Sequence, residues 1–116
     1  MITEYYTIEE RYQIANTIWL QLGSQRFSLV TGCKPVCYGE KDGKVFLLLS
    51  VGKNERGINL FEVACNEGVD LYEVSFMRKH GEETSVVAHQ TGIYNDMLHT
   101  VFEQYSGMKV NFKVAA

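Results

Sequence analysis

Residues 41–90 decide the fold of this chain, and they read KDGKVFLLLSVGKNERGINLFEVACNEGVDLYEVSFMRKHGEETSVVAHQ. Short apolar segments alternate with polar turns throughout this stretch. Tyr72, Val74 and Phe76 alternate with Glu73 and Ser75, which indicates a half-buried β-strand. The connections between segments are too short for a helical crossover, so neighbouring strands are expected to run antiparallel. A parallel nucleotide-binding sheet is therefore excluded.

Turn signals divide this stretch and its flanks into strands. Asp42-Gly43 is typical of a two-residue hairpin turn, because both central residues of that turn need positive φ. Further turns are expected at residues 52–57, 66–68 and 79–83. The expected strands are residues 26–31, 35–38, 45–51, 58–65, 70–78 and 84–89. Residues 45–51 are apolar on both faces, which predicts a central strand that is either covered on both sides or closely packed.

Amphipathic helices are expected on either side of the strands. Residues 7–10, Thr-Ile-Glu-Glu, form a capping box, and apolar residues then recur at helical spacing over residues 8–22, up to Gly23. A second apolar stripe over residues 94–105 predicts another helix, which ends at Ser106-Gly107. Residues 108–116 are expected to form either an edge strand or a mobile tail.

These patterns together predict an α+β domain. We expect an antiparallel meander of five to six strands, with an N-terminal and a C-terminal amphipathic helix packed on it. The chain has 116 residues, of which 46% are hydrophobic, so it can bury one core without disulfides. Residues 1–116 are therefore expected to form a single domain.

Composition limits the partners and the compartment. The net charge of −3 gives no support for general binding to polyanions. The N-terminus lacks a basic region followed by an apolar one, and the longest apolar run, residues 45–49, is too short to span a bilayer. Three cysteines, Cys33, Cys37 and Cys65, fit a reducing compartment better than secretion. We expect a cytoplasmic protein with no membrane partner.

The sequence contains no local catalytic or metal motif. Cys33 and Cys37 are separated by three residues, but the remaining metal-binding side chains, Cys65, His80, His89 and His99, are scattered over different elements. Phosphate-binding loops, nucleophile elbows and the zinc-protease helix motif are all missing from the sequence. We therefore assign no catalytic residue, metal or cofactor. An enzyme assembled from distant positions stays open as an alternative.

The turns separate charge between the two ends of the meander. Successive turns of an antiparallel series lie at opposite ends, so turns 52–57 and 79–83 share one end, and turns 41–44 and 66–68 share the other. The second end carries Glu40, Asp42, Glu67 and Asp70, with Lys41 and Lys44. The first, called here the basic end, carries Lys53, Arg56, Arg78, Lys79 and His80. It is the candidate surface for phosphates or for an acidic protein.

Several short segments resemble a known group of proteins. They are TIWLQLGSQRF (17–27), TG (31–32), GIN (57–59), DLY (70–72) and GIYNDML (92–98). In order and spacing they are similar to a widespread group of small, uncharacterised proteins of bacteriophages and other mobile elements, over about residues 17–106. The departure is Ser106-Gly107-Met108, which stands where that group typically has a Thr-Gly-Leu-Tyr-like ending.

The resemblance implies an origin and no activity. Arg26, Asn59 and Asp70 are the polar positions that it draws attention to, although a structural hydrogen bond at a turn or strand end is the favoured role of each. The sequence favours a non-enzymatic interaction protein that binds a phage or host macromolecule, with an anti-defence or host-modulating role. A homodimer formed through an edge strand is a further expectation. The alternatives are a nucleic-acid-binding protein that uses the basic end and, less favoured, a small enzyme or metal protein.

Overall fold

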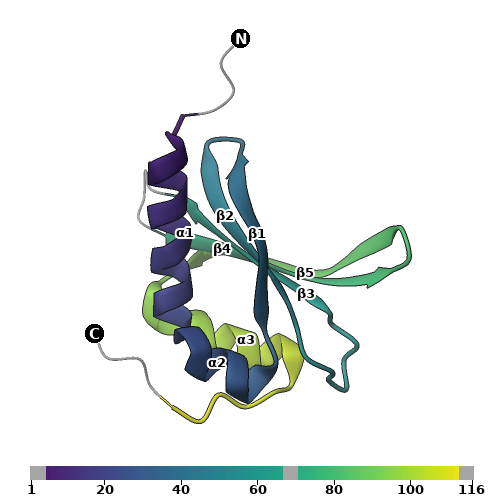
Figure 1. Ribbon diagram of the computed structural model, residues 1–116. Helices are drawn as coiled ribbons and strands as arrows, with labels where there is room; N and C mark the ends of the chain where they lie inside the picture. Colours follow the sequence, from purple (N-terminus) through teal and green to yellow (C-terminus); the bar gives the residue numbers. More distant parts are fainter. Residues whose placement is uncertain (1–4, 67–70, 113–116) are drawn as a thin grey trace.

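The computed structural model describes residues 5–66 and 71–112 and confirms the α+β meander (Figure 1). Its sheet is antiparallel, with strands in the order β1-β2-β3-β4-β5. Two helices precede the sheet, and a short 3-10 turn and a third helix follow it. The bounds are α1 Ile8–Leu22, α2 Ser24–Thr31, β1 Lys34–Lys41, β2 Lys44–Ser50, β3 Leu60–Asn66, β4 Leu71–His80, β5 Glu83–Ile93, η1 Asn95–Met97 and α3 Leu98–Ser106.

The helices pack on one face of the sheet, and the core lies between them and the strands (Figure 1). Phe102 of α3 occupies the centre of this core, and its ring centroid is 5.1 Å from that of Phe27 and 5.3 Å from that of Phe61. No element of the described chain covers the opposite face of the sheet, called here the outer face (Figure 1).

The first helix begins and ends as its sequence predicts. The Thr7 hydroxyl accepts a hydrogen bond from the Glu10 amide, and the Glu10 carboxylate accepts one from the Thr7 amide. The bond from the Thr7 amide is the main cause that lowers the pKa of Glu10, because it stabilises the charged carboxylate. At the other end, Gly23 adopts a left-handed conformation with a φ of 118°. The capping box and the glycine stop are therefore both confirmed.

Residues 26–31 form a helix, so the strand predicted there is wrong. They belong to α2, in which Phe27 and Thr31 lie four residues apart on the buried side. A strand would have placed Phe27 and Leu29 on the same face, whereas Leu29 is 87% exposed. The Thr31 hydroxyl donates to the Phe27 carbonyl (2.7 Å) and accepts from the Cys33 amide (3.1 Å). Over only six residues the apolar positions Phe27, Leu29 and Val30 do not settle the period, and packing against α1 and α3 decided for the helix.

The second strand is an interior strand, but the described helices cover only one of its faces. β2 pairs with β1 on one side and with β3 on the other. Val45, Leu47 and Leu49 are buried beneath the helices, whereas Phe46 and Leu48 on the other side are half-buried. Its run of apolar residues therefore reflects an outer face that is partly apolar, and not a second covering layer.

The turns mostly follow the sequence chemistry. Asp42 and Gly43 have φ values of 54° and 76°, as the hairpin turn requires. The turn after His80 is also present, although β5 starts at Glu83 and continues to Ile93, past the predicted end at residue 89. Register shifts opposite residues 72–74 and 76–77 of β4 accommodate this longer strand. Most of the predicted turn at residues 66–68 lies outside the described residues.

The segment after α3 packs across the helices. The ring of Phe112 lies beneath the Arg26 guanidinium, 4.7 Å from ring centroid to Cζ, and meets His99 edge-on. As far as Phe112 this segment adds no strand to the sheet, and residues 113–116 lie outside the described part. None of the described helices has the length and apolar composition needed to cross a bilayer.

Candidate binding site

Strand pairing gathers polar side chains on the outer face of the sheet. Glu62 of β3 lies opposite Ser75 of β4, and Ser75 lies opposite His89 of β5. Glu73 lies two residues from Ser75 along β4, so its side chain points to the same face. Residues from three strands, separated by up to 27 positions in sequence (His89 minus Glu62), therefore meet in one cluster.

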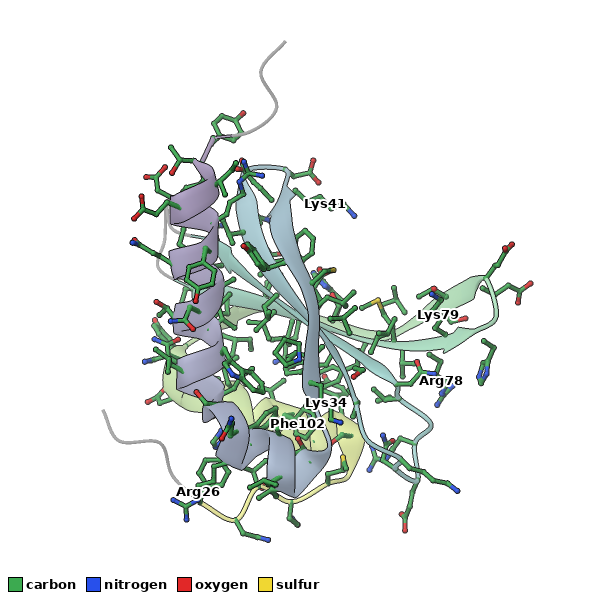
Figure 2. The ribbon with its side chains drawn as sticks, viewed as in Figure 1. Arg26, Lys34, Lys41, Arg78, Lys79 and Phe102 are labelled. Atoms are coloured by element: carbon green, nitrogen blue, oxygen red, sulfur yellow. The ribbon has the colours of Figure 1, made fainter. Side chains whose placement is uncertain are left out.

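A pocket of about 230 Å³ lies over this cluster. It extends from the cluster to the turn between β1 and β2, where Figure 2 shows Lys41 near the end of the hairpin. The residues that line it are Lys41, Asp42, Lys44, Phe46, Glu62, Ala64, Glu73, Ser75 and His89.

A chain of polar contacts crosses the pocket. The Lys44 ammonium forms an ion pair with the Glu73 carboxylate, whose other oxygen is 3.5 Å from His89 Nε2. The Nδ1 atom of His89 is 2.8 Å from the Ser75 hydroxyl oxygen. Because only 17% of the Glu73 side chain is exposed, its charge needs these partners. Glu73 is therefore compensated within the protein.

The contacts of Ser75, His89 and Glu73 resemble the elements of a nucleophilic triad, but the surrounding backbone does not support that chemistry. Acyl transfer needs donors aimed at a developing oxyanion, commonly free backbone N–H groups. Ser75 lies within β4, whose backbone pairs with β3 on one side and β5 on the other. At Ser75 itself the backbone lies in regular pairing, opposite Glu62 on one side and His89 on the other. Among the described residues, no group of three or more His, Cys, Asp or Glu side chains is placed so that it could hold a metal ion.

Glu62 differs from Glu73 because nothing in the described chain satisfies its carboxyl. It accepts no hydrogen bond and forms no ion pair there, and its side chain is half-buried in the middle of the sheet. Burial raises the pKa of Glu62, and the charges of Lys41 and His89 only partly oppose this effect. The carboxylate is thus the polar group of the pocket that would gain most from an external partner.

The raised pKa of Glu62 predicts a measurable pH dependence of stability. The ordinary pKa of Glu62 is 4.5, and above it the folded protein holds the Glu62 proton more tightly than the unfolded chain does. The free energy of unfolding therefore falls as pH rises through the raised pKa that Glu62 has in the folded state. Glu62→Gln removes this ionisation. We expect its Tm to exceed that of the wild type near pH 8 and to match it near about pH 4, where both states of Glu62 are protonated.

Thermal unfolding followed by circular dichroism over this pH range measures the effect. Glu82→Gln, in the exposed turn between β4 and β5, is the matched control and should follow the wild type at each pH. Parallel profiles of Glu62→Gln and wild type would contradict the assignment.

Two of the five side chains of the predicted basic end have a structural role, namely those of Arg56 and Arg78. Arg56 Nη1 donates to the Gln104 carbonyl near the end of α3 (3.2 Å), and Arg78 Nε donates to the Arg56 carbonyl (3.0 Å). The side-chain amide of Asn59 donates to the Lys79 carbonyl (2.8 Å) and accepts from the Lys79 backbone amide (2.7 Å). These bonds join the 54–57 turn to β4 and to α3.

The remaining predicted residues are dispersed. The exposed side chains of Lys53, Lys79 and His80 lie at this end, with Lys79 on the hairpin arm that β4 and β5 extend away from the body (Figure 2). Arg26 lies far from them on α2, against Phe112 (Figure 2). Asp70 is outside the described residues. The structure therefore brings Arg56, Asn59, Arg78 and Lys79 together and leaves Arg26 apart.

Sequence reasoning missed the cluster on the outer face. Its one local signal was the alternation in residues 70–78, which placed Glu73 and Ser75 on the same side of a strand. Joining them to Glu62 and His89 required the register of three strands, which no local pattern supplies.

Comparison with known proteins adds no relative. No protein-family model matches the chain, and no curated protein or solved structure matches it significantly. The argument for a function therefore rests on the geometry of the outer face.

Proposed function

We propose that this chain is a non-enzymatic interaction protein that binds a protein partner through the outer face of its sheet. The observation that carries the proposal is the composition of that face, where half-exposed apolar side chains surround the charged pocket. The resemblance to proteins of phages and mobile elements supports an anti-defence or host-modulating role for the interaction. The free thiols of Cys33 and Cys37 are in keeping with a cytoplasmic location.

The apolar part of the outer face comes from neighbouring strands. Leu48 of β2 lies opposite Glu62, and Leu60 of β3 lies opposite Met77 of β4. Val86 of β5 continues this row and is 63% exposed. Contiguous apolar area beside a polar group is typical of protein interfaces, in which aromatic residues and Met are enriched.

A protein partner fits this face better than a nucleic acid does. Binding to phosphates needs cations that are free to neutralise them. Lys44 is already paired with Glu73, and the guanidinium groups of Arg56 and Arg78 donate to backbone carbonyls. At the basic end, the exposed side chains of Lys53 and Lys79 are the lysines that could neutralise phosphates in the nucleic-acid alternative.

The sheet edges are less favourable for association than the outer face. β1 contains Pro35 next to a register shift, and β5 is interrupted by two register shifts opposite β4. Proline and bulges are devices that prevent the pairing of an edge strand with another chain. A homodimer through an edge strand is therefore secondary in this proposal.

Leu48→Asp tests the proposal, because it places a charge among the apolar side chains of the outer face, directly opposite Glu62. Tagged variants are used to capture proteins from a lysate of the source cells, and the captured proteins are quantified by mass spectrometry. We expect Leu48→Asp to capture one or a few specific proteins in amounts that are lower by at least about tenfold, as for a central interface residue. Leu29→Asp, the same change at an 87% exposed position on α2, should retain them.

Two results would contradict the proposal. One is equal capture by both variants, after circular dichroism has shown that both are folded. The other is recovery of nucleic acid in place of protein, with its loss in Lys53→Glu/Lys79→Glu, which would favour the basic end. Val86→Asp, at a more exposed site of the same face, repeats the test if Leu48→Asp does not fold.

A further inference from the structure

The pocket contains one half-buried carboxyl group, that of Glu62, without a hydrogen bond or ion pair within the described chain. Glu73 is held by Lys44 and His89, and the Ser75 hydroxyl is held by His89. Glu62 faces the same space without a hydrogen bond or ion pair to any described residue. A half-buried carboxylate in this situation is stabilised strongly by a cation that reaches it.

The charges around the pocket also favour a cationic ligand. Three carboxylates, those of Asp42, Glu62 and Glu73, face two ammonium groups, those of Lys41 and Lys44. With His89 left out of the count, the lining therefore carries one more carboxylate than ammonium groups. An anionic ligand would have to separate Lys44 from Glu73, which would leave a carboxylate that is mostly buried without its cation.

The volume of the pocket matches one side chain. At about 230 Å³ it is smaller than the roughly 300–1,000 Å³ of sites that enclose a whole drug-sized ligand. A partner protein can fill such a space by inserting a single residue at the centre of an interface.

The aromatic wall of the pocket favours arginine over lysine. The Phe46 ring occupies the space above Gly39, where a Cβ atom would lie 3.2 Å from the ring. A guanidinium can stack on an aromatic ring and pair with a carboxylate through two hydrogen bonds, whereas an ammonium acts as a compact, strongly hydrated charge. Phe46 and Glu62 line the same pocket and supply these two surfaces.

We infer that the outer-face pocket is a binding site for an arginine side chain of the protein partner, with the guanidinium between the Glu62 carboxylate and the Phe46 ring. This inference rests on the proposed function and names the residue that the partner inserts.

N-acetyl-arginine amide, titrated into the ¹⁵N-labelled protein, tests the site without the partner. We expect saturable NMR shifts of the Glu62, Ala64 and Ser75 amides, with a Kd on the order of millimolar, as for one anchoring side chain. N-acetyl-lysine amide should bind at least about threefold more weakly, because it lacks the planar fork. Glu62→Gln should abolish the shifts, and Glu82→Gln should retain them.

Three results would overturn the inference. They are the absence of saturable shifts, shifts of the same size in Glu62→Gln, and equal affinity for the lysine compound, which would indicate a general ammonium site. Failure here is distinct from failure of the proposed function. If arginine amide does not bind while Leu48→Asp still loses the partner, the inference is wrong and the proposed function stands.

Discussion

Replacing Phe102 by alanine is expected to lower the free energy of unfolding by about 3–5 kcal/mol. The Phe102 side chain is fully buried, and its ring joins α3 to α2 through Phe27 and to the sheet through Phe61 and Phe76. The variant loses the free energy that is gained by transferring the ring out of water. It also leaves a cavity between α2, α3, β3 and β4. Because a domain of this size is stable by only about 5–15 kcal/mol, the loss is a large fraction of the total.

Urea unfolding followed by circular dichroism measures this effect. Phe112→Ala deletes the same ring at a half-buried position after α3 and should cost much less. Equal costs for the two variants would contradict the central position of Phe102, which Figure 2 shows between the helices and the sheet.

Gly52→Ala is expected to cost about 1–3 kcal/mol through steric overlap. An added Cβ atom at Gly52 would lie 2.5 Å from the Thr31 carbonyl oxygen and 3.0 Å from Gly32 Cα. The Gly52 amide also donates to that carbonyl (3.2 Å), so the backbone cannot move away without losing the hydrogen bond. The contact holds the end of α2 against the chain that leaves β2.

Gly81→Ala separates this steric effect from backbone strain. Gly81 has a φ of +62°, but no atom lies within 4 Å of the added Cβ, so the cost should be only that of the left-handed conformation, about 1–2 kcal/mol. Gly52 carries no such φ penalty. Urea unfolding of a double mutant should show additive costs, because the two sites share no partner. A Gly52→Ala variant as stable as the wild type would refute the close approach.

Local chemistry accounts for the elements that were predicted correctly. The α1 start depends on Thr7 and Glu10, which are three residues apart, and the first hairpin depends on Asp42 and Gly43, which are adjacent. Such signals act over a few residues, so they can be read without the rest of the chain. The same is true of the alternation that predicts β4.

The errors occur where the local signal is short or ambiguous. Residues 26–31 are too short a segment for their three apolar side chains to settle the period, and the contacts of the Phe27 ring with Trp19, His99 and Phe102 decide for the helix. In β5, register shifts opposite β4 extend the strand beyond residue 89. In each case contacts with distant residues decided the outcome.

The candidate site shows the same division. The charges of the predicted basic end could be read from the turns, but the structure uses Arg56 and Arg78 to bind backbone carbonyls. Glu62, Ser75 and His89 carry no motif and become a cluster because the register of three strands places them in one row. Whether a polar side chain is satisfied by the chain itself depends on that register.

The sequence by itself therefore determined the antiparallel meander, most of its turns, the first helix and the presence of a C-terminal helix, because periodicity and turn chemistry are properties of neighbouring residues. Only the tertiary structure decided that residues 26–31 are helical, that one face of the sheet stays uncovered, and that Glu62 lies in a pocket without a partner among the described residues. Burial and strand register arise from contacts between residues far apart in the chain, and single-sequence patterns do not encode those contacts.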